Sequence, residues 1–179
     1  MSNAAALQLG NRRAKEIIAR HILNVILVPF AKDALQHAIK GRILRGSNMT
    51  GNTINSYAAG VYVKGHLAWI ETPSGSIPGP LQRKLGRGQK FFTAQQRWDG
   101  EIQENTFKGK VSNNGGKEPE RSVSFLKSYK AITDGWEVVV CNGVEYASYQ
   151  ENVMEIDVLT RSYDDAKFMF PTFIKPLPD

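Results

Sequence analysis

The feature that most constrains this fold is an amphipathic segment near the N-terminus, over residues 11–40. Ile18, Ile22, Val25 and Pro29 recur there at three- and four-residue steps, the spacing of one helix face. The charged side chains between residues 12 and 20 lie mostly outside this stripe. The pattern predicts a long helix that packs the stripe against a hydrophobic core.

The ends and the middle of this helix also have sequence signals. Asn11 is a typical N-cap residue, because its short side chain can accept a hydrogen bond from a free N–H of the first turn. Pro29 lacks an N–H and its ring meets the carbonyl of Val25, so we expect a kink or break there. A second helical piece is expected to end at Lys40, with Gly41 as the C′ residue.

After the helix, the apolar pattern changes to that of strands. The segment 135–143 is β-branched, short and closed by Asn-Gly, and two earlier runs read as a hairpin with its turn at residues 65–66. Residues 153–159 fit either a strand or a helix. We expect strands at four places: 57–64, 67–70, 135–143 and 167–170, the last one stopped by Pro171.

The 179 residues are enough for one domain with a real core, and we expect a single α+β domain over residues 1–179. The long helix would pack on a small, mostly antiparallel sheet. Residues 72–130 are interrupted repeatedly by glycine and proline, which predicts a long loop excursion from the sheet. Within it, residues 91–92 and 122–129 are expected to be ordered.

The sequence favours a reducing cytoplasm and no membrane contact. Cys141 is the sole cysteine, which excludes an internal disulfide. The most apolar run, residues 22–31, is interrupted by Asn24 and Pro29 and falls short of the roughly 20 residues of a bilayer span. No basic residue precedes Arg12, whereas a signal peptide begins with positive charge.

Charge is distributed unevenly along the chain. Residues 1–90 hold 13 Lys and Arg against 3 Asp and Glu, a balance of +10. Residues 91–179 hold 10 against 14, a balance of −4, which gives the formal net charge of +6. A basic half joined to an acidic half predicts oriented contacts with other surfaces.

Three short motifs, in this order, resemble those of the head–tail joining proteins of tailed bacteriophages, also called neck or tail-completion proteins. They are Thr-Gly-Asn-Thr-Ile-Asn-Ser at 50–56, Asn-Gly-Val-Glu-Tyr-Ala-Ser-Tyr-Gln-Glu at 142–151, and Phe-Met-Phe-Pro at 168–171. Thr53 replaces the usual leucine and Asn152 the usual glycine. The residues that carry the resemblance are Gly51, Asn52, Tyr146, Tyr149, Phe168 and Pro171.

The resemblance implies a long helix across a small antiparallel sheet, assembled into a homo-oligomeric ring without enzymatic activity. The implied partners are further copies of the chain and neighbouring head or tail proteins, in the virion and in the bacterial host cytoplasm during assembly. If residues 146–151 are helical, Tyr146 and Tyr149 share one face. Glu151 would then lie at the rim, where it can pair with a basic side chain of a neighbour.

A basic stretch at residues 83–90 is the most pointed surface feature. Arg83, Lys84, Arg87 and Lys90 are accompanied by no acidic residue, and two glycines lie among them. Three interpretations stay open: contact with an acidic protein surface, contact with DNA in a ring channel, and a solvated loop. The alternative function is accordingly a basic nucleic-acid-binding module without enzymatic activity.

Candidate catalytic residues are few. Cys141 ends an apolar strand, which favours a buried, inert thiol over a nucleophile served by His21, His37 or His66. Ser124 belongs to a Ser-x-x-Lys pattern that lacks the companion motifs of acyl-transfer enzymes. A hydrolase using Cys141 or Ser124 is the third hypothesis. We expect no catalytic, cofactor-binding or metal-ligating residue, and no cofactor.

Overall fold

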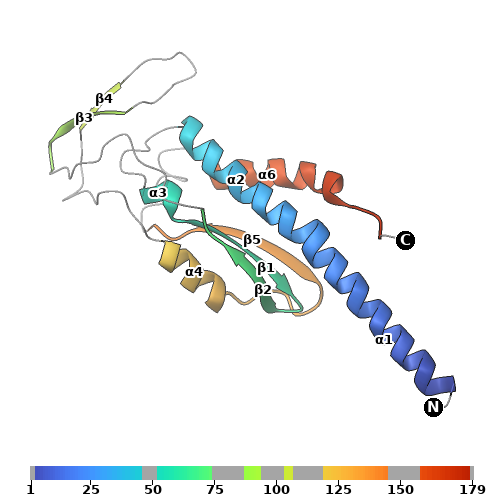
Figure 1. The fold of residues 1–179 in the computed structure, drawn as a ribbon. Helices are drawn as coiled ribbons and strands as arrows, with labels where there is room; N and C mark the ends of the chain where they lie inside the picture. Colours follow the sequence, from blue (N-terminus) through green and yellow to red (C-terminus); the bar gives the residue numbers. More distant parts are fainter. Residues whose placement is uncertain are drawn as a thin grey trace.

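The computed structural model describes residues 3–45, 52–73, 87–93, 103–106, 119–144 and 158–177. They combine a long N-terminal helix with a small antiparallel sheet and shorter helices, which confirms the predicted α+β class (Figure 1). The elements are α1 (Asn3–His21), the π-helical segment η1 (Ile22–Leu27), α2 (Val28–Arg45), α3 (Asn52–Asn55), β1 (Tyr57–Val63), β2 (His66–Glu71), β3 (Lys90–Thr93), β4 (Gln103–Thr106), α4 (Pro119–Ser128), β5 (Trp136–Asn142), α6 (Val158–Met169) and the 3₁₀ turn η2 (Phe170–Phe173).

The first three elements form one continuous helical rod (Figure 1). Pro29 is the second residue of α2 and follows Val28, whose N–H bonds to the carbonyl of Leu23, five residues earlier. The irregularity that proline causes therefore takes the form of a wider π-helical turn, which accommodates the missing N–H without breaking the rod.

The rod extends beyond both predicted ends. It begins at Asn3 rather than at Asn11, and it continues past Gly41 to Arg45. Gly41 is therefore a helical residue and not a C′ residue, which corrects the prediction. A Cβ at Gly41 would lie 3.5 Å from Cγ1 of Val158, so this position is where α6 crosses closely over α2. Tertiary packing against α6 supports the helix beyond the glycine.

The core face of the rod differs from the predicted stripe. Leu27, Ala31 and Leu35 are buried and recur every four residues, whereas Ile18 and Val25 are each 42% exposed. The prediction that the stripe packs on the core therefore holds for Ile22, which packs against the larger core cluster, and is wrong for Ile18 and Val25. Nine residues separate Ile18 from Leu27, which is not a whole number of helical turns, so the two faces point in different directions.

The sheet has β1 at its centre, in the order β2-β1-β5, and both pairings are antiparallel. The predicted hairpin is confirmed, although its turn is Lys64–Gly65 and His66 belongs to β2. Both turn residues have positive φ, 49° and 80°, which is the backbone of the tight turns that match strand twist. The predicted strand at 135–143 is β5, one edge of this sheet.

The two faces of the sheet are covered by different helices. Tyr57 and Val61 of β1 belong to the larger core cluster with α2 and α6, while Tyr62 packs on Leu126 of α4 on the other face. The Tyr62 hydroxyl donates a hydrogen bond to the carbonyl of Leu126. Alternate residues of β1 therefore hold two helical layers to one strand.

The predicted excursion contains two described parts. A short ribbon pairs Lys90 of β3 with Thr106 of β4, and Thr93 with Gln103. Helix α4 supplies the second part and includes most of the patch expected at 122–129. The rest of the predicted excursion, at residues 74–86, 94–102 and 107–118, lies outside the described residues.

The rod contains the one described helix that is long and apolar enough to cross a membrane by length and composition, Leu7–Arg42. The prediction that the apolar run is too short considered residues 22–31 alone. In the structure, 39% of the most apolar window is buried, and Leu35 and Ile39 in α2 belong to the core against the sheet. Part of the apolar surface of this helix is thus buried in the core of the protein.

Candidate functional site

The first two sequence motifs meet at a buried polar junction. The side-chain amide of Asn142 donates to the carbonyl of Thr53 at 2.8 Å, and the N–H of Gly143 donates to the carbonyl of Ser56 at 3.3 Å. Ser122 of α4 also donates its hydroxyl to the Ser56 carbonyl. Ser56 and Ser122 are fully buried. These contacts join segments up to 89 residues apart in the sequence, at the place where β1 begins and β5 ends.

Only part of the two motifs can be placed. Asn52 begins the short helix α3, just before the junction. Gly51, Tyr146, Tyr149 and Glu151 lie outside the described residues, so the predicted roles of the tyrosines and of Glu151 stay predictions. The described contacts are structural: they fix the ends of strands and the start of α4.

The third motif is helical, which corrects the prediction of a strand at 167–170. Phe168 lies in the last turn of α6 and is 86% exposed, and Pro171 lies in η2 instead of ending an edge strand. The ring of Phe170 packs edge-on against Phe30 of α2, with centroids 4.9 Å apart. Because α6 must pack along α2, helical contacts outweigh the local strand tendency of Phe-Met-Phe.

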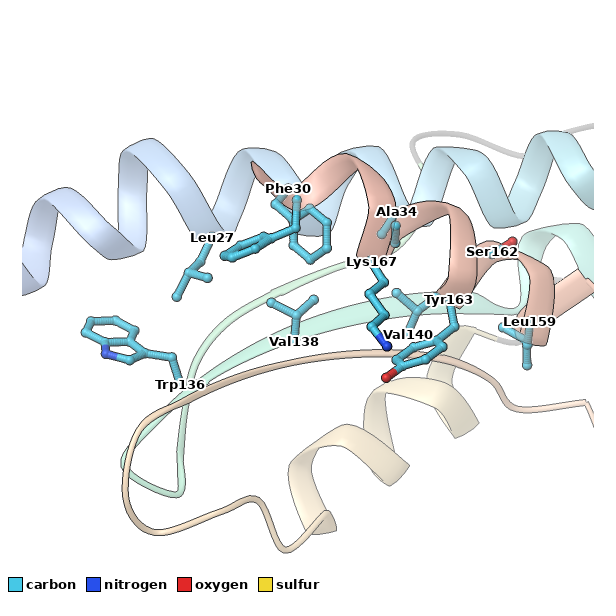
Figure 2. A pocket seen from close by; sticks show the side chains of 12 residues that line it. Leu27, Phe30, Ala34, Trp136, Val138, Val140, Leu159, Ser162, Tyr163 and Lys167 are labelled. Carbon is cyan, nitrogen blue, oxygen red and sulfur yellow. The ribbon is translucent and has the colours of Figure 1, made fainter. Parts of the chain in front are cut away.

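An apolar groove of about 400 Å³ lies between α2, β5 and α6, and we call it the α6 groove (Figure 2). One side is the β5 face that presents Trp136, Val138 and Val140, and the other includes Leu159 and Tyr163 of α6. Figure 2 shows the Tyr163 and Lys167 side chains reaching from α6 toward β5. All residues of β5 are only partly buried. Sequence reasoning missed this groove, because it depends on where α6 lies.

A second unfilled apolar surface lies on α1. Leu7, Ala14, Ile17 and Ile18 form what we call the α1 stripe, and all four are exposed. The exposed fractions of Leu7 and Ile17 are 69% and 62%. In Figure 1, α1 extends away from the sheet and the other described elements. The apolar spacing that the sequence reveals is real, but no described residue of the same chain covers this surface.

The basic stretch is only partly described. Lys90, the first residue of β3, and Arg87, three residues before it, are exposed, whereas Arg83 and Lys84 lie outside the described residues. The structure therefore places two of the four predicted contact residues on the surface. Neither of these two residues lines the α6 groove.

Cys141, His21 and His37, the candidate nucleophile and two of its candidate bases, each contact groups that belong to the fold. The Cys141 thiol donates a hydrogen bond to the carbonyl of Ser122 at 3.7 Å, and burial raises the pKa of this thiol to about 11. His21 on the rod contacts the carbonyl of Lys175, and His37 lies 3.6 Å from Asp33 one turn away. Within the described part of the chain, no group of three or more His, Cys, Asp or Glu residues is arranged to hold a metal ion.

Alkaline pH should weaken the fold through two partly or fully buried side chains, Tyr62 and Cys141. Burial raises the pKa of Tyr62 from 10.0 to about 12 and that of Cys141 from 9.0 to about 11. The unfolded chain releases both protons at lower pH than the folded chain, so stability is lost as pH rises from about 9 to 12. Urea midpoints measured across this window should fall.

The double variant Tyr62→Phe with Cys141→Ala should show a shallower fall of the urea midpoint with pH. Tyr163→Phe, at an exposed tyrosine, is the matched control and should retain the slope of the original protein. Identical slopes for the double variant and the control would contradict the assignment of the alkaline transition to these buried groups.

No protein-family model, curated protein or solved structure matches this chain.

Proposed function

We propose that this chain is a structural protein of a tailed phage or prophage particle, and that it joins the DNA-filled head to the tail as one subunit of a homo-oligomeric ring. The resemblance of three ordered motifs supports this proposal. The buried junction adds to it, because Asn142 and Gly143 of the second motif bond directly to Thr53 and Ser56 of the first.

The observation that carries the proposal is the exposed apolar surface of α1. Helix α1 projects from the rest of the described structure, and its Ile17 side chain is 62% exposed. Contiguous apolar patches on a protein surface mark sites of interaction with proteins or membranes. The sheet with its two helical layers supplies a rigid body, and the rod presents that surface at a fixed angle.

The proposed mechanism is fit between rigid faces, without bond-making chemistry. Copies of the chain contact each other around the ring, and the two outer faces of the ring contact head and tail proteins. The basic half and the acidic half, at +10 and −4, suit contacts between unlike surfaces. In this proposal the ring also contacts DNA in its channel, through residues 83–90.

Sizing and imaging test this proposal directly. Light scattering of the purified protein, alone and mixed with the neighbouring virion proteins, should show a complex of several copies, and negative-stain images should show rings. A chain that stays strictly monomeric beside its neighbouring virion proteins would overturn the proposal.

A basic nucleic-acid-binding module is the second candidate, favoured by the exposure of Arg87 and Lys90. Changing Arg83, Lys84, Arg87 and Lys90 together to alanine should then abolish a salt-sensitive mobility shift on short DNA. The matched control removes four other exposed positive charges, at Lys40, Lys64, Lys127 and Lys130. Equal loss in both variants would indicate nonspecific charge attraction and count against a dedicated site.

A further inference from the structure

We infer that residues 170–177, which we call the C-terminal strap, form a releasable support that keeps the N-terminal rod straight across a hinge at η1. Release of the strap lets α1 swing relative to the rest of the protein. The strap consists of η2 (Phe170–Phe173) and the four residues after it. The inference concerns a motion within one chain, so it holds or fails independently of the proposed ring.

The rod contains a point at which helices commonly bend. Pro29 cannot donate the N–H of a regular helical hydrogen bond, and its ring crowds the carbonyl of Val25. The turn before it is π-helical, with the N–H of Val28 bonded to the carbonyl of Leu23. Prolines and π-helical turns are among the few causes of sharp helix kinks. In Figure 1 the rod nevertheless runs straight through this point, which indicates support from outside the rod.

The strap contacts the rod on both sides of this hinge. On the C-terminal side of η1, the rings of Phe170 and Phe173 lie edge-on to Phe30, with centroid distances of 4.9 and 5.5 Å. On the N-terminal side, the Nε2 atom of His21 lies 3.1 Å from the carbonyl oxygen of Lys175. Since a carbonyl oxygen only accepts hydrogen bonds, Nε2 is the donor. A segment attached before and after a hinge resists bending at that hinge.

The hydrogen bond of His21 lies where α1 leaves the rest of the protein. Core packing holds η1 itself, because Ile26 and Leu27 are buried. In α1, by contrast, every residue from Leu7 to Arg20 except Ala19 is exposed. The strap therefore acts at the base of a helical arm that projects into solvent.

The contacts of the strap are of a kind that opens without loss of the core. Phe170 is its fixed end, because this ring packs against the larger core cluster. Beyond it, Phe173 is half-buried, while Ile174 to Leu177 are exposed and the His21–Lys175 hydrogen bond is itself exposed. Segments with few buried contacts and exposed hydrogen bonds open locally at a small fraction of the free energy of unfolding.

A small bend at η1 moves the end of α1 a long way. Gln8 lies 20 residues before Val28 in the sequence, or about 30 Å along the helix at 1.5 Å per residue. A bend of about 20°, the lower limit of a sharp kink, displaces Gln8 by about 10 Å. The α1 stripe moves with it, so the state of the strap sets where this apolar surface is presented.

Distances between two spin labels in the full-length protein test the inference. Gln8→Cys on α1 and Lys127→Cys on α4 provide exposed labelling sites, and Cys141→Ala removes the native thiol. The labelled chain is diluted with unlabelled protein, so that double electron–electron resonance measures distances within one molecule. With an intact strap, the distance distribution should be narrow.

The strap is then released by Phe173→Ala together with His21→Ala. These changes remove one ring from Phe30 and the hydrogen bond to the carbonyl of Lys175. The distance distribution should broaden by up to about 10 Å, the displacement expected for a bend of about 20°. Adding Pro29→Ala to the released protein should narrow the distribution again, because alanine restores a helical N–H at the hinge.

Two controls separate a hinge from general loosening. Ile174→Ala removes an apolar side chain of the same strap that is 59% exposed, and it should leave the distribution narrow. A second label pair, Lys40→Cys on α2 with Lys127→Cys, reports on the part of the rod after the hinge. Its distance should stay the same in every variant, because this part of α2 packs on the core.

Three results would overturn the inference. An unchanged distribution after release of the strap would mean that the rod stays straight without it. Equal broadening in Ile174→Ala, or broadening of the second label pair, would assign the effect to loosening of the whole fold. A distribution that stays broad after Pro29→Ala would place the bend outside the hinge at η1. None of these results bears on ring formation, which light scattering and imaging test separately.

Discussion

Replacing Leu35 by alanine is expected to lower the free energy of unfolding by about 2–5 kcal/mol, the usual range for a large-to-small change in a core. Leu35 is 1% exposed and lies in α2, where it belongs to the larger core cluster together with Tyr57 and Val61 of β1. The change removes its contacts and leaves a cavity. Since α2 is the main helical cover of this sheet face, the loss should affect the whole described body.

The measurement is urea unfolding followed by circular dichroism, with Leu9→Ala as the control. The control makes the same chemical change in the same rod at a side chain that is 43% exposed. It should shift stability by no more than about 0.5 kcal/mol, as surface substitutions usually do. Similar losses at the two positions would mean that the rod does not pack on the sheet through Leu35.

Gly143→Ala is expected to destabilise the protein by about 1–3 kcal/mol, the usual range for overpacking. A Cβ at this position would lie 2.6 Å from the backbone nitrogen of Ser122 and 2.8 Å from Cβ of Arg121. Backbone atoms cannot move aside as a flexible side chain can, so the start of α4 must shift. That shift would disturb the hydrogen bonds of Ser122 and Gly143 to the carbonyl of Ser56.

Gly10→Ala is the matched control, and it should have the opposite sign. A Cβ at Gly10 meets nothing within 4 Å, and alanine is favoured over glycine inside a helix by about 1 kcal/mol. Thermal unfolding of the two variants should therefore move the midpoint down for Gly143→Ala and leave it unchanged or higher for Gly10→Ala. A Gly143→Ala protein as stable as the original would contradict the close approach of α4 to the end of β5.

Local sequence signals were sufficient to predict the strands of the sheet and its hairpin turn. The change to a strand pattern around Val61, the turn at Gly65 and the β-branched run of β5 all appear in the structure as a paired sheet. These signals depend on side chains that alternate along one strand and on a glycine that permits positive φ, both of which are visible in the sequence.

Local signals could not predict whether the α1 stripe packs on its own chain or on another molecule. Apolar spacing predicts that the side of the helix with Ile18 packs against something, but the spacing is identical whether that partner is the same chain or another molecule. The extension of the helix to Asn3 was missed because Asn11 is a good N-cap residue, although an N-cap residue is tolerated inside a helix at modest cost.

The nature of the C-terminal segment and the α6 groove depended on tertiary contacts. Phe168-Met169-Phe170 favours a strand by local preference, yet Val158 is buried against the rod and Phe170 packs on Phe30, which together require a helix followed by a 3₁₀ turn. The groove exists only because α6 lies beside α2 and β5. The single-domain extent over residues 1–179 stays a prediction.

The most direct test of the central claim is electron microscopy of particles assembled with and without this protein, in the phage or prophage that encodes it. Without it, filled heads and complete tails should accumulate separately, and adding the original protein should join them. Normal joining of heads and tails in its absence would contradict the claim that this chain is a structural component of the junction.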